Sequence, residues 1–193
     1  MASNPIPILT EEEYLKRERA AEFKSEYLGG VVHAMAGGTE NHALVGGNLF
    51  GEVWLALRGR DCKVFFENMR VRISRISSYY YPDIMVACAK TEFATAAKDN
   101  LLNPVVIIEV LSPSTEAFDR GEKCRNYKRI ETLREYVLVS PDKPIIERLE
   151  RADNGFWLTE DIEGLDATLR LSSLDIAIPL SAIYRGIDLA PPL

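Results

Sequence analysis

YPDIMVA (residues 81–87), NPVVIIEVLSPST (103–115) and DRGEKCRNYKR (119–129) form the region that decides the fold of this chain. The first two segments contain short runs rich in Val and Ile, bounded by Pro and Ser, which is typical of buried strands. Asp83 opens the first apolar run and Glu109 lies inside the second. A carboxylate in a buried strand is costly unless it is paired, protonated or bound to a cation. Two of them on successive strands are therefore expected to converge on one hard metal ion.

Both carboxylates also have simpler interpretations. Asp83 follows Pro82, and an aspartate in that position can cap a turn. Glu109 can form a structural ion pair with Lys123 or an arginine, which perturbs pKa values without catalysis. These alternatives remain open at this point.

Length and composition predict one domain, residues 1–193, of an ordinary globular kind. The 21.7 kDa chain is 47% hydrophobic and 27% charged, and it contains no apolar run of the roughly 20 residues that span a bilayer. The N-terminal residues lack the basic start and apolar core of a signal peptide, so a cytoplasmic protein without membrane partners is expected.

The metal-ligating residue types favour a hard cation. The two histidines, His33 and His42, make a multi-histidine zinc site improbable. Oxygen ligands favour Mg²⁺ or Mn²⁺. Three widely spaced cysteines, Cys62, Cys88 and Cys124, predict reduced thiols that serve mostly for packing.

The formal net charge of −6 and the pI near 5.1 argue against tight, non-specific coating of nucleic acid. They leave room for a local basic surface. Six cations follow the second carboxylate closely: Arg120, Lys123, Arg125, Lys128, Arg129 and Arg134. The commoner role of such a run is a solvated helix face.

The remaining sequence predicts helices and strands in alternation. Thr10 and Glu13 form a capping box for a helix ending near Phe23, and Gly29-Gly30 predicts a tight hairpin. Asp119 with Glu122 predicts the start of a helix that continues to about Thr132. Other expected elements are a helix over 42–57, two strands within 62–73, a link over 77–80, a surface loop over 89–103, a strand over 136–139, a hairpin around 153–155, a strand over 167–171 and a helix over 180–184.

Several of these segments together resemble a known family. They are EYLGG from Glu26, MAGGTENH ending at His42, YPD ending at Asp83, EVLSPST from Glu109, DxxxKxxxY from Asp119 to Tyr127, and EYVLV from Glu135. The chain resembles the Uma-two family of restriction-endonuclease-like proteins, within the PD-(D/E)XK nuclease superfamily. The resemblance implies an α/β fold with a restriction-endonuclease-like core: a central mixed β-sheet flanked by helices, with an N-terminal helix and β-hairpin.

The resemblance also implies a metal-dependent endonuclease. In that scheme Asp83, Glu109 and the carbonyl of Val110 bind Mg²⁺ (or Mn²⁺), which activates a water that attacks a DNA phosphodiester. The superfamily lysine two positions after the second acid is replaced here by Leu111. Lys123 fits the DxxxKxxxY pattern and is predicted to supply the missing cation, with Lys128 as the second candidate.

Four further residues receive weaker assignments. Glu26 resembles an N-terminal acid that holds a second ion or its water, or it is an exposed strand residue beside a turn. His42 is predicted to contact substrate, to orient Glu26 or to serve only as a capping or packing residue. Tyr127 is expected to pack in the core with its hydroxyl bonded to the site, and Asp119 to cap a helix.

Two classes of function follow. The first is a Mg²⁺-dependent DNA endonuclease, expected to be a homodimer because two cuts on a duplex favour two-fold symmetry. The second is a catalytically inactive module that keeps the nuclease fold and binds nucleic acid or a protein partner. A structural metal site in an unrelated hydrolase is a third interpretation.

Overall fold

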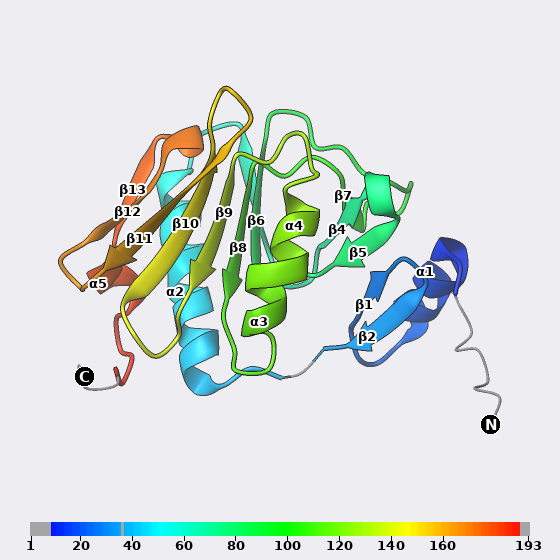
Figure 1. Ribbon diagram of the computed structural model, residues 1–193, viewed down its shortest axis with the longest axis horizontal. Coiled ribbons are helices and arrows are strands. Elements are labelled where there is room, and N and C mark those ends of the chain that lie inside the picture. Colours follow the sequence, from blue (N-terminus) through cyan, green and yellow to red (C-terminus); the bar gives the residue numbers. More distant parts are fainter. Residues whose placement is uncertain (1–8, 36, 190–193) are drawn as a thin grey trace.

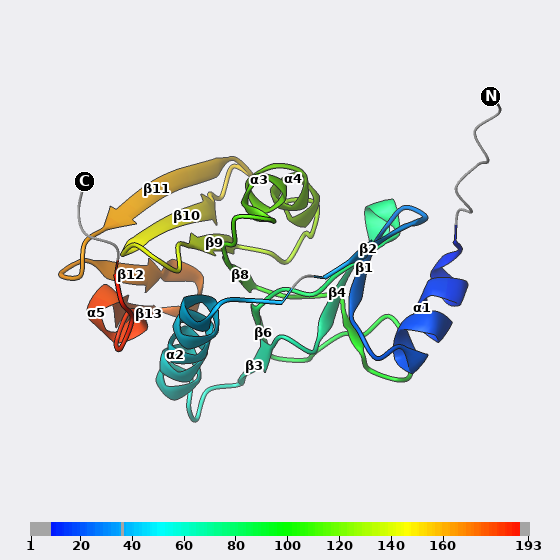
Figure 2. The ribbon, with the colours of Figure 1, turned by 90° about the horizontal axis from the view of Figure 1, so that it is seen from below.

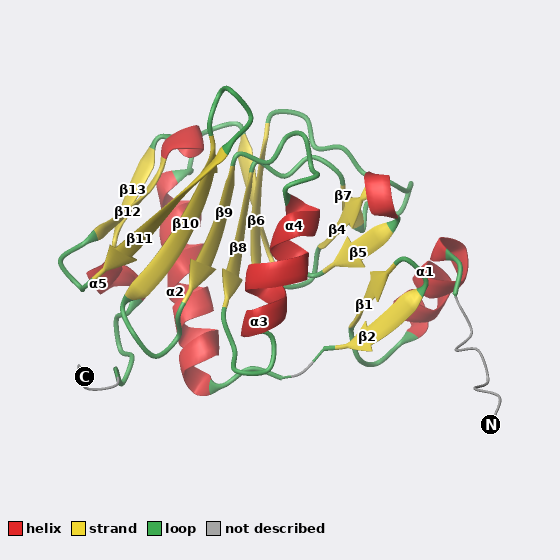
Figure 3. Ribbon diagram, viewed as in Figure 1, coloured by secondary structure: helices red, strands yellow, loops and turns green. Residues whose placement is uncertain are grey.

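The computed structural model describes residues 9–35 and 37–189 of the chain. It contains a large and a small β-sheet with helices packed around them, so the predicted mixed sheet flanked by helices is confirmed (Figure 1, Figure 3). Within these residues, no helix is both long and apolar enough to cross a membrane.

The large sheet has six strands in the order β11-β10-β9-β8-β6-β3. Only β8 and β9 pair in parallel, and the other neighbours are antiparallel. In that order the strands are Trp157–Glu163, Ile145–Arg151, Glu135–Val139, Val106–Val110, Ile84–Cys88 and Cys62–Phe66.

Each face of this sheet is covered by different elements (Figure 2). Side chains alternate between faces along a strand, so Val106, Ile108 and Val110 of β8 pack with helix α2 (Glu40–Ala56). The same apolar cluster includes the two-stranded sheet of β12 (Thr168–Leu171) and β13 (Ile176–Pro179) and helix α5 (Leu180–Ile183).

The opposite face carries a helical segment that begins at Glu116 and ends at Tyr127. It consists of α3 (Glu116–Phe118), a π-helical turn (Asp119–Lys123) and α4 (Cys124–Tyr127). Glu109 shares this face with Ile107 of β8 and with Leu111, which directly follows the strand, because side chains two residues apart in extended chain point the same way. The segment is therefore placed to meet Glu109.

The small sheet has the order β2-β1-β5-β4-β7 and lies beside helix α1 (Glu11–Ala20) (Figure 1). Its strands in that order are Val31–Ala34, Ser25–Leu28, Ser78–Tyr80, Arg70–Ile73 and Asn100–Leu101. The capping box is confirmed: Glu13 N donates to Thr10 Oγ1 at 3.2 Å, and Thr10 N donates to the Glu13 carboxylate at 2.9 Å. The hairpin at Gly29-Gly30 is confirmed, and both glycines have the positive φ that the turn requires.

Three predictions about local structure were wrong, and one strand was missed. Residues 78–80 form a buried strand and not a link, and the 89–103 segment contains strand β7, which pairs in parallel with β4. The helical segment begins at Glu116 and ends at Tyr127, so Asp119 lies inside it and is not its N-cap. The missed strand is β13.

The cysteine prediction was also wrong. Cys62 and Cys88 face each other across β3 and β6 and form a disulfide, because the antiparallel register places them directly opposite. Cys124 remains a free, buried thiol, as expected.

Candidate active site

Asp83 and Glu109 meet where β6 begins and β8 ends. The antiparallel register pairs Ile84 with Ile108, which brings the preceding Asp83 beside Glu109. The backbone N–H of Asp83 lies 3.4 Å from Glu109 Oε2, and Val110 N donates to Asp83 Oδ2 at 2.7 Å. The two acidic residues therefore lie side by side, and their binding of one metal ion stays a prediction. The observed contact of Val110 is through its N–H, and the role predicted for its carbonyl stays a prediction.

Lys123 lies at the centre of a cluster of carboxylates. Its ammonium nitrogen is 2.9 Å from Glu109 Oε1, 3.2 Å from Glu26 Oε1 and 3.4 Å from Asp119 Oδ1. The lysine side chain is only 7% exposed. Asp119 and Lys123 are four residues apart on one helical face, which is why they approach each other.

Tyr127 completes this face one turn later. Its hydroxyl donates to Glu109 Oε1 at 2.8 Å, and its ring packs in the core against Tyr80 and Tyr136. Leu111, at the usual position of the superfamily lysine, is buried in the same apolar cluster. The structure therefore brings Lys123 to the acids from the helix, while Leu111 contributes packing.

Glu26 reaches the cluster from strand β1, and its orientation is fixed from two sides. It accepts a hydrogen bond from Tyr81 N at 3.1 Å, and it pairs with Lys123. The predicted alternative, an exposed strand residue, is wrong, because Glu26 is only 7% exposed.

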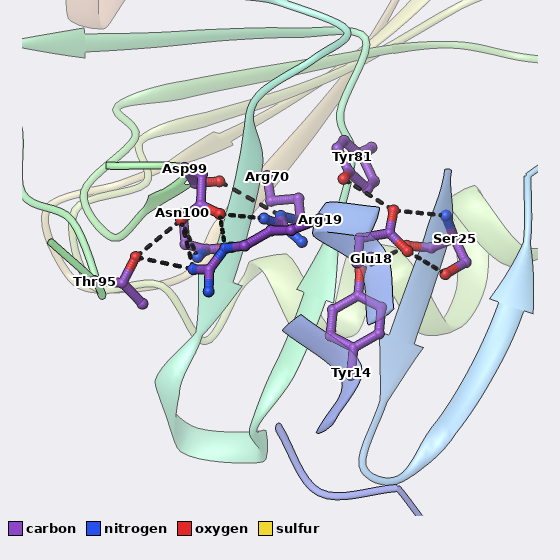
Figure 4. A network of polar contacts seen from close by, with 9 residues as sticks. All are labelled: Tyr14, Glu18, Arg19, Ser25, Arg70, Tyr81, Thr95, Asp99 and Asn100. Carbon is purple, nitrogen blue, oxygen red and sulfur yellow. Dashed lines mark hydrogen bonds and ion pairs between the residues drawn. The ribbon is translucent and has the colours of Figure 1, made fainter. Parts of the chain in front are cut away.

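Figure 4 shows contacts of Glu18 with Ser25 and Tyr81. Glu18 of α1 accepts hydrogen bonds from Ser25 N at 2.9 Å, from Ser25 Oγ at 2.5 Å and from the Tyr81 hydroxyl at 3.0 Å. Ser25 precedes Glu26 in the chain, and Tyr81 N bonds the Glu26 carboxylate. Glu18 thus joins the two backbone segments that hold Glu26.

The same figure shows how α1 is tied to the rest of the small sheet. Asp99 accepts from Arg19 Nε at 2.8 Å and from Arg70 Nη2 at 2.5 Å (Figure 4). The Arg70 guanidinium also lies 5.6 Å above the Tyr81 ring. These contacts hold Tyr81 against the N-terminal helix. They also hold the backbone that leads from Tyr81 to Asp83.

His42 and Lys128, the two remaining predicted residues, differ in outcome. His42 Nε2 lies 3.7 Å from Asp83 Oδ2, so His42 is positioned to act on Asp83 rather than on Glu26. Gly38 passes close to its ring, where an added Cβ would lie 2.9 Å from His42 Nδ1. Lys128 points elsewhere, with its ammonium 5.4 Å above the Trp157 ring, and it does not line the cavity described next.

A cavity of about 720 Å³ opens onto these residues. One wall comes from the β1–β2 hairpin and the following loop, and another comes from residues 112–123. Its described lining carries five carboxylates but a single ammonium group: Glu26, Asp83, Glu109, Asp119 and Glu122 against Lys123. This excess of negative charge is the dominant electrostatic feature of the site.

Burial shifts the pKa values of these groups. Burial raises the pKa of Glu109 well above its usual range, and Lys123 only partly offsets this effect. Burial also raises the pKa of Asp83, against the opposing influence of the Val110 N–H and of His42. For Lys123, burial lowers the pKa, but the carboxylates of Glu109, Glu26 and Asp119 outweigh it, so its pKa is raised well above the usual range. The surrounding carboxylates therefore favour the protonated form of Lys123.

The donor set fits a hard cation that keeps water ligands. In the described part of the chain, no group of three or more His, Cys, Asp or Glu side chains is arranged to hold a metal ion, and the carboxylates contact Lys123 instead. Mg²⁺ needs fewer protein ligands than three, because it is commonly bound by one or two carboxylates together with waters and substrate phosphates. Asp83 and Glu109 supply such a pair, and the uncompensated negative charge favours a cation.

Sequence reasoning missed several residues that build this site. Glu18, Tyr81 and Asp99 position it, and His33 and Glu122 line the cavity. No spacing motif identifies Glu18, because its partners lie 7 and 63 residues away. Glu122 stood in the sequence next to Lys123 and was taken only as part of a helix start.

Comparison with known proteins gives consistent results. Two proteins of Synechocystis sp. (strain ATCC 27184 / PCC 6803 / Kazusa), both described as uncharacterized, are similar: slr1290 is 35% identical over 96% of each chain, and sll1609 is 34% identical over 88% of this chain and 96% of its own. A crystal structure from Anabaena variabilis, titled as "a putative nuclease belonging to DUF820", superposes with a TM-score of 0.74 at 20% identity, over 91% of this chain and 97% of the other. At that identity the likeness shows a shared fold. Residues 11–181 match the model of the Uma2 (Uma-two) family, described as "Putative restriction endonuclease". The chain belongs to the Uma2 family.

Proposed function

We propose that this protein is a metal-dependent nuclease that hydrolyses phosphodiester bonds in DNA at the Asp83–Glu109 site. Membership of a family described as restriction endonucleases supports nuclease-like chemistry. The observation that carries the proposal is the composition of the cavity: five carboxylates face one buried ammonium group. A phosphodiester anion entering such a cavity is repelled unless a divalent cation lies between it and the acids.

Asp83 and Glu109 would hold that cation, with the Val110 carbonyl as a further ligand. A bound Mg²⁺ or Mn²⁺ supplies Lewis-acid chemistry and a water of lowered pKa. The protein keeps the two acids in place through their neighbours. Val110 N–H and His42 fix Asp83, and the Tyr127 hydroxyl and Lys123 fix Glu109.

Lys123 would stabilise the charge that develops on the phosphate oxygens. An ammonium group has three N–H donors, and three carboxylates surround this one. A contact with substrate must therefore replace one of these partners. The pair with Asp119 is the longest, at 3.4 Å, so it is the one we expect to open. Lys128 takes no part in this step, because its side chain lies over Trp157.

A second candidate function is a catalytically inactive module that binds nucleic acid or a protein partner. The same lysine favours it, since an ammonium surrounded by three carboxylates is also a structural ion-pair cluster. The two candidates differ in one observable. The nuclease cleaves DNA in the presence of Mn²⁺ and loses this activity in Glu109→Gln, whereas the inactive module cleaves neither DNA nor RNA.

The proposal includes a homodimer, because two cuts on a duplex are made most simply by two sites related by a two-fold axis. Sedimentation equilibrium with and without a DNA duplex tests this part. A protein that stays monomeric in both conditions would make single-strand nicks the expected product.

A further inference from the structure

The other end of the α3–α4 helical segment carries a second charged surface, opposite in sign to the cavity. Five cations gather there around one aromatic side chain, and we call them together the Trp157 surface. Its members are Arg125, Lys128, Arg129, Arg134, Arg151 and Trp157. They come from α4, from the segment before β9, and from the β10–β11 hairpin (Figure 1).

Contacts join four of these residues: Lys128, Arg134, Arg151 and Trp157. The Arg151 guanidinium lies 4.9 Å and the Lys128 ammonium 5.4 Å from the centre of the Trp157 ring. Arg151 N bonds the carbonyl of Arg134, which brings that arginine alongside. Arg125 and Arg129 are exposed and lie one helical turn apart beside Lys128.

The positive charge of this surface is not neutralised within the described residues. None of its five cations has a carboxylate within 4 Å among the described residues, whereas Arg120, which precedes Arg125 in the same helical segment, pairs with Glu116 and Glu147. The nearby Glu131 pairs with Arg75 instead. Arg151 is held by the carbonyls of Lys128 and Glu131, at 2.5 and 3.0 Å, so its charge is fixed in place without an anionic partner.

Arg151 distinguishes this surface from a solvated helix face, because its side chain is partly buried. Burial and the neighbouring Arg134 both lower the pKa of Arg151. An anionic partner would relieve the repulsion between these like charges.

We propose that the Trp157 surface binds the sugar–phosphate backbone of the nucleic acid whose phosphodiester enters the Asp83–Glu109 cavity. The identity of the polyanion rests on the proposed function, while the surface itself rests on the contacts above. Lys123 and Arg125 belong to the same helical segment, and a duplex carries phosphates along its whole length, about one per 1.7 Å of axis. A single duplex lying along this segment would present phosphates to both Lys123 and the Trp157 surface.

The test is equilibrium binding of a labelled mixed-sequence DNA duplex, without divalent metal, across a series of salt concentrations. The variant is the triple substitution Arg125→Glu, Arg129→Glu and Arg134→Glu, whose side chains are all exposed. The matched control reverses three exposed arginines elsewhere, Arg60, Arg170 and Arg185, and so has the same net charge. Both variants need an unchanged thermal midpoint.

Each phosphate contact contributes about 0.9 to the slope of log affinity against log salt, so the triple variant should have a slope shallower by about 2 to 3. At low salt it should bind DNA at least about tenfold more weakly than wild type. The control variant should change the DNA affinity and the salt slope much less. A second variant, Trp157→Ala, should weaken binding while leaving the salt slope nearly unchanged.

Three outcomes overturn the proposal. The triple variant binds DNA as tightly as wild type, or the control variant loses as much DNA affinity as the triple variant. In the third outcome wild type does not bind DNA, whether or not it binds phosphatidylserine vesicles. A separate cleavage assay with Mn²⁺ distinguishes failure of the nuclease proposal from failure of the proposal for the Trp157 surface. Wild type that cleaves DNA but binds it independently of the Trp157 surface retains the proposed function and loses this inference. Wild type that binds through the surface and never cleaves retains the inference and loses the nuclease.

Discussion

The Asp83 backbone N–H lies 3.4 Å from Glu109 Oε2, at the point where strand β6 begins and strand β8 ends. Antiparallel pairing places the start of one strand beside the end of the next, so two acids 26 residues apart in sequence share one end of the sheet. Burial of both acids near a single lysine makes the site a strong candidate for a divalent cation.

Replacing one of these acids should weaken metal binding. Asp83→Asn keeps the shape of the side chain and removes its charge, so Mn²⁺ affinity measured by calorimetry should fall at least tenfold, which corresponds to about 1.4 kcal/mol. Asp61→Asn, an exposed aspartate, serves as the control. Equal affinities of Asp83→Asn and wild type would remove Asp83 from the metal site.

The raised pKa values of Glu109 and Asp83 predict an unusual dependence on pH. The folded protein holds these protons more tightly than the unfolded chain does. The stability that these groups contribute is therefore present below the ordinary carboxyl pKa, and it is lost as the pH rises through the raised values. Lys123 stays protonated across this range.

Urea unfolding over a series of pH values above the ordinary carboxyl pKa of about 4 checks this pH dependence, because the pKa values of both acids are raised. Without metal, the free energy of unfolding should decline over this range in wild type and decline less in Glu109→Gln. Mn²⁺ binds the ionised acids, so its affinity should rise with pH. A metal affinity that is flat or falls with rising pH would show that these carboxyls do not control binding.

Lys123 should be important for stability as well as for activity. Removing one partner of a buried ion pair typically costs about 3–5 kcal/mol, so Lys123→Ala should lose stability of that order near neutral pH, whereas Lys16→Ala on the exposed face of α1 should lose little. Mn²⁺ should restore part of the lost stability, because it supplies positive charge to the same carboxylates. A Lys123→Ala protein as stable as wild type would mean that the ion-pair cluster does not form in solution.

Glu18 should affect the site without touching it. Glu18→Ala breaks the contacts that hold Ser25 and Tyr81, so Glu26 should lose its fixed orientation toward Lys123. We expect Mn²⁺-dependent cleavage to fall through a lower kcat with little change in KM, and Glu18→Gln, which keeps an acceptor, to recover part of it. Glu12→Ala, an exposed residue of the same helix, is the matched control. Equal effects of Glu18→Ala and Glu12→Ala on kcat would assign Glu18 a purely structural role.

The residues of this site that could be predicted from sequence are those that stand out from their neighbours in the chain. Glu109 stands out because a charged residue interrupts a run of Val and Ile. Lys123 was assigned because it fits the DxxxKxxxY pattern of the family that the chain resembles. Both inferences need only a short stretch of sequence. The orientation of Glu26 was not accessible, because it depends on a hydrogen bond from Tyr81 N, 55 residues away.

The same distinction between local and long-range features applies to the fold. Long apolar strands such as β8 and β9 were predicted, since buried parallel strands read as continuous hydrophobic runs. The two-residue strand β7 exists only through its pairing with β4, and the Cys62–Cys88 disulfide exists only through the register of β3 with β6. Neither pairing leaves a local pattern in the chain.

The most direct test of the account is Mn²⁺-dependent cleavage of supercoiled plasmid by wild type, Glu109→Gln, Lys123→Ala and Lys128→Ala, each at a temperature where it is folded. We predict that wild type cleaves, and that Glu109→Gln and Lys123→Ala are slower by about 100-fold or more, as is typical when a group that stabilises transition-state charge is removed. Lys128→Ala, which removes one cation of the Trp157 surface and none from the cavity, should lose much less activity. Wild-type protein that cleaves neither DNA nor RNA would contradict the nuclease assignment. An active Lys123→Ala beside an inactive Lys128→Ala would contradict the site.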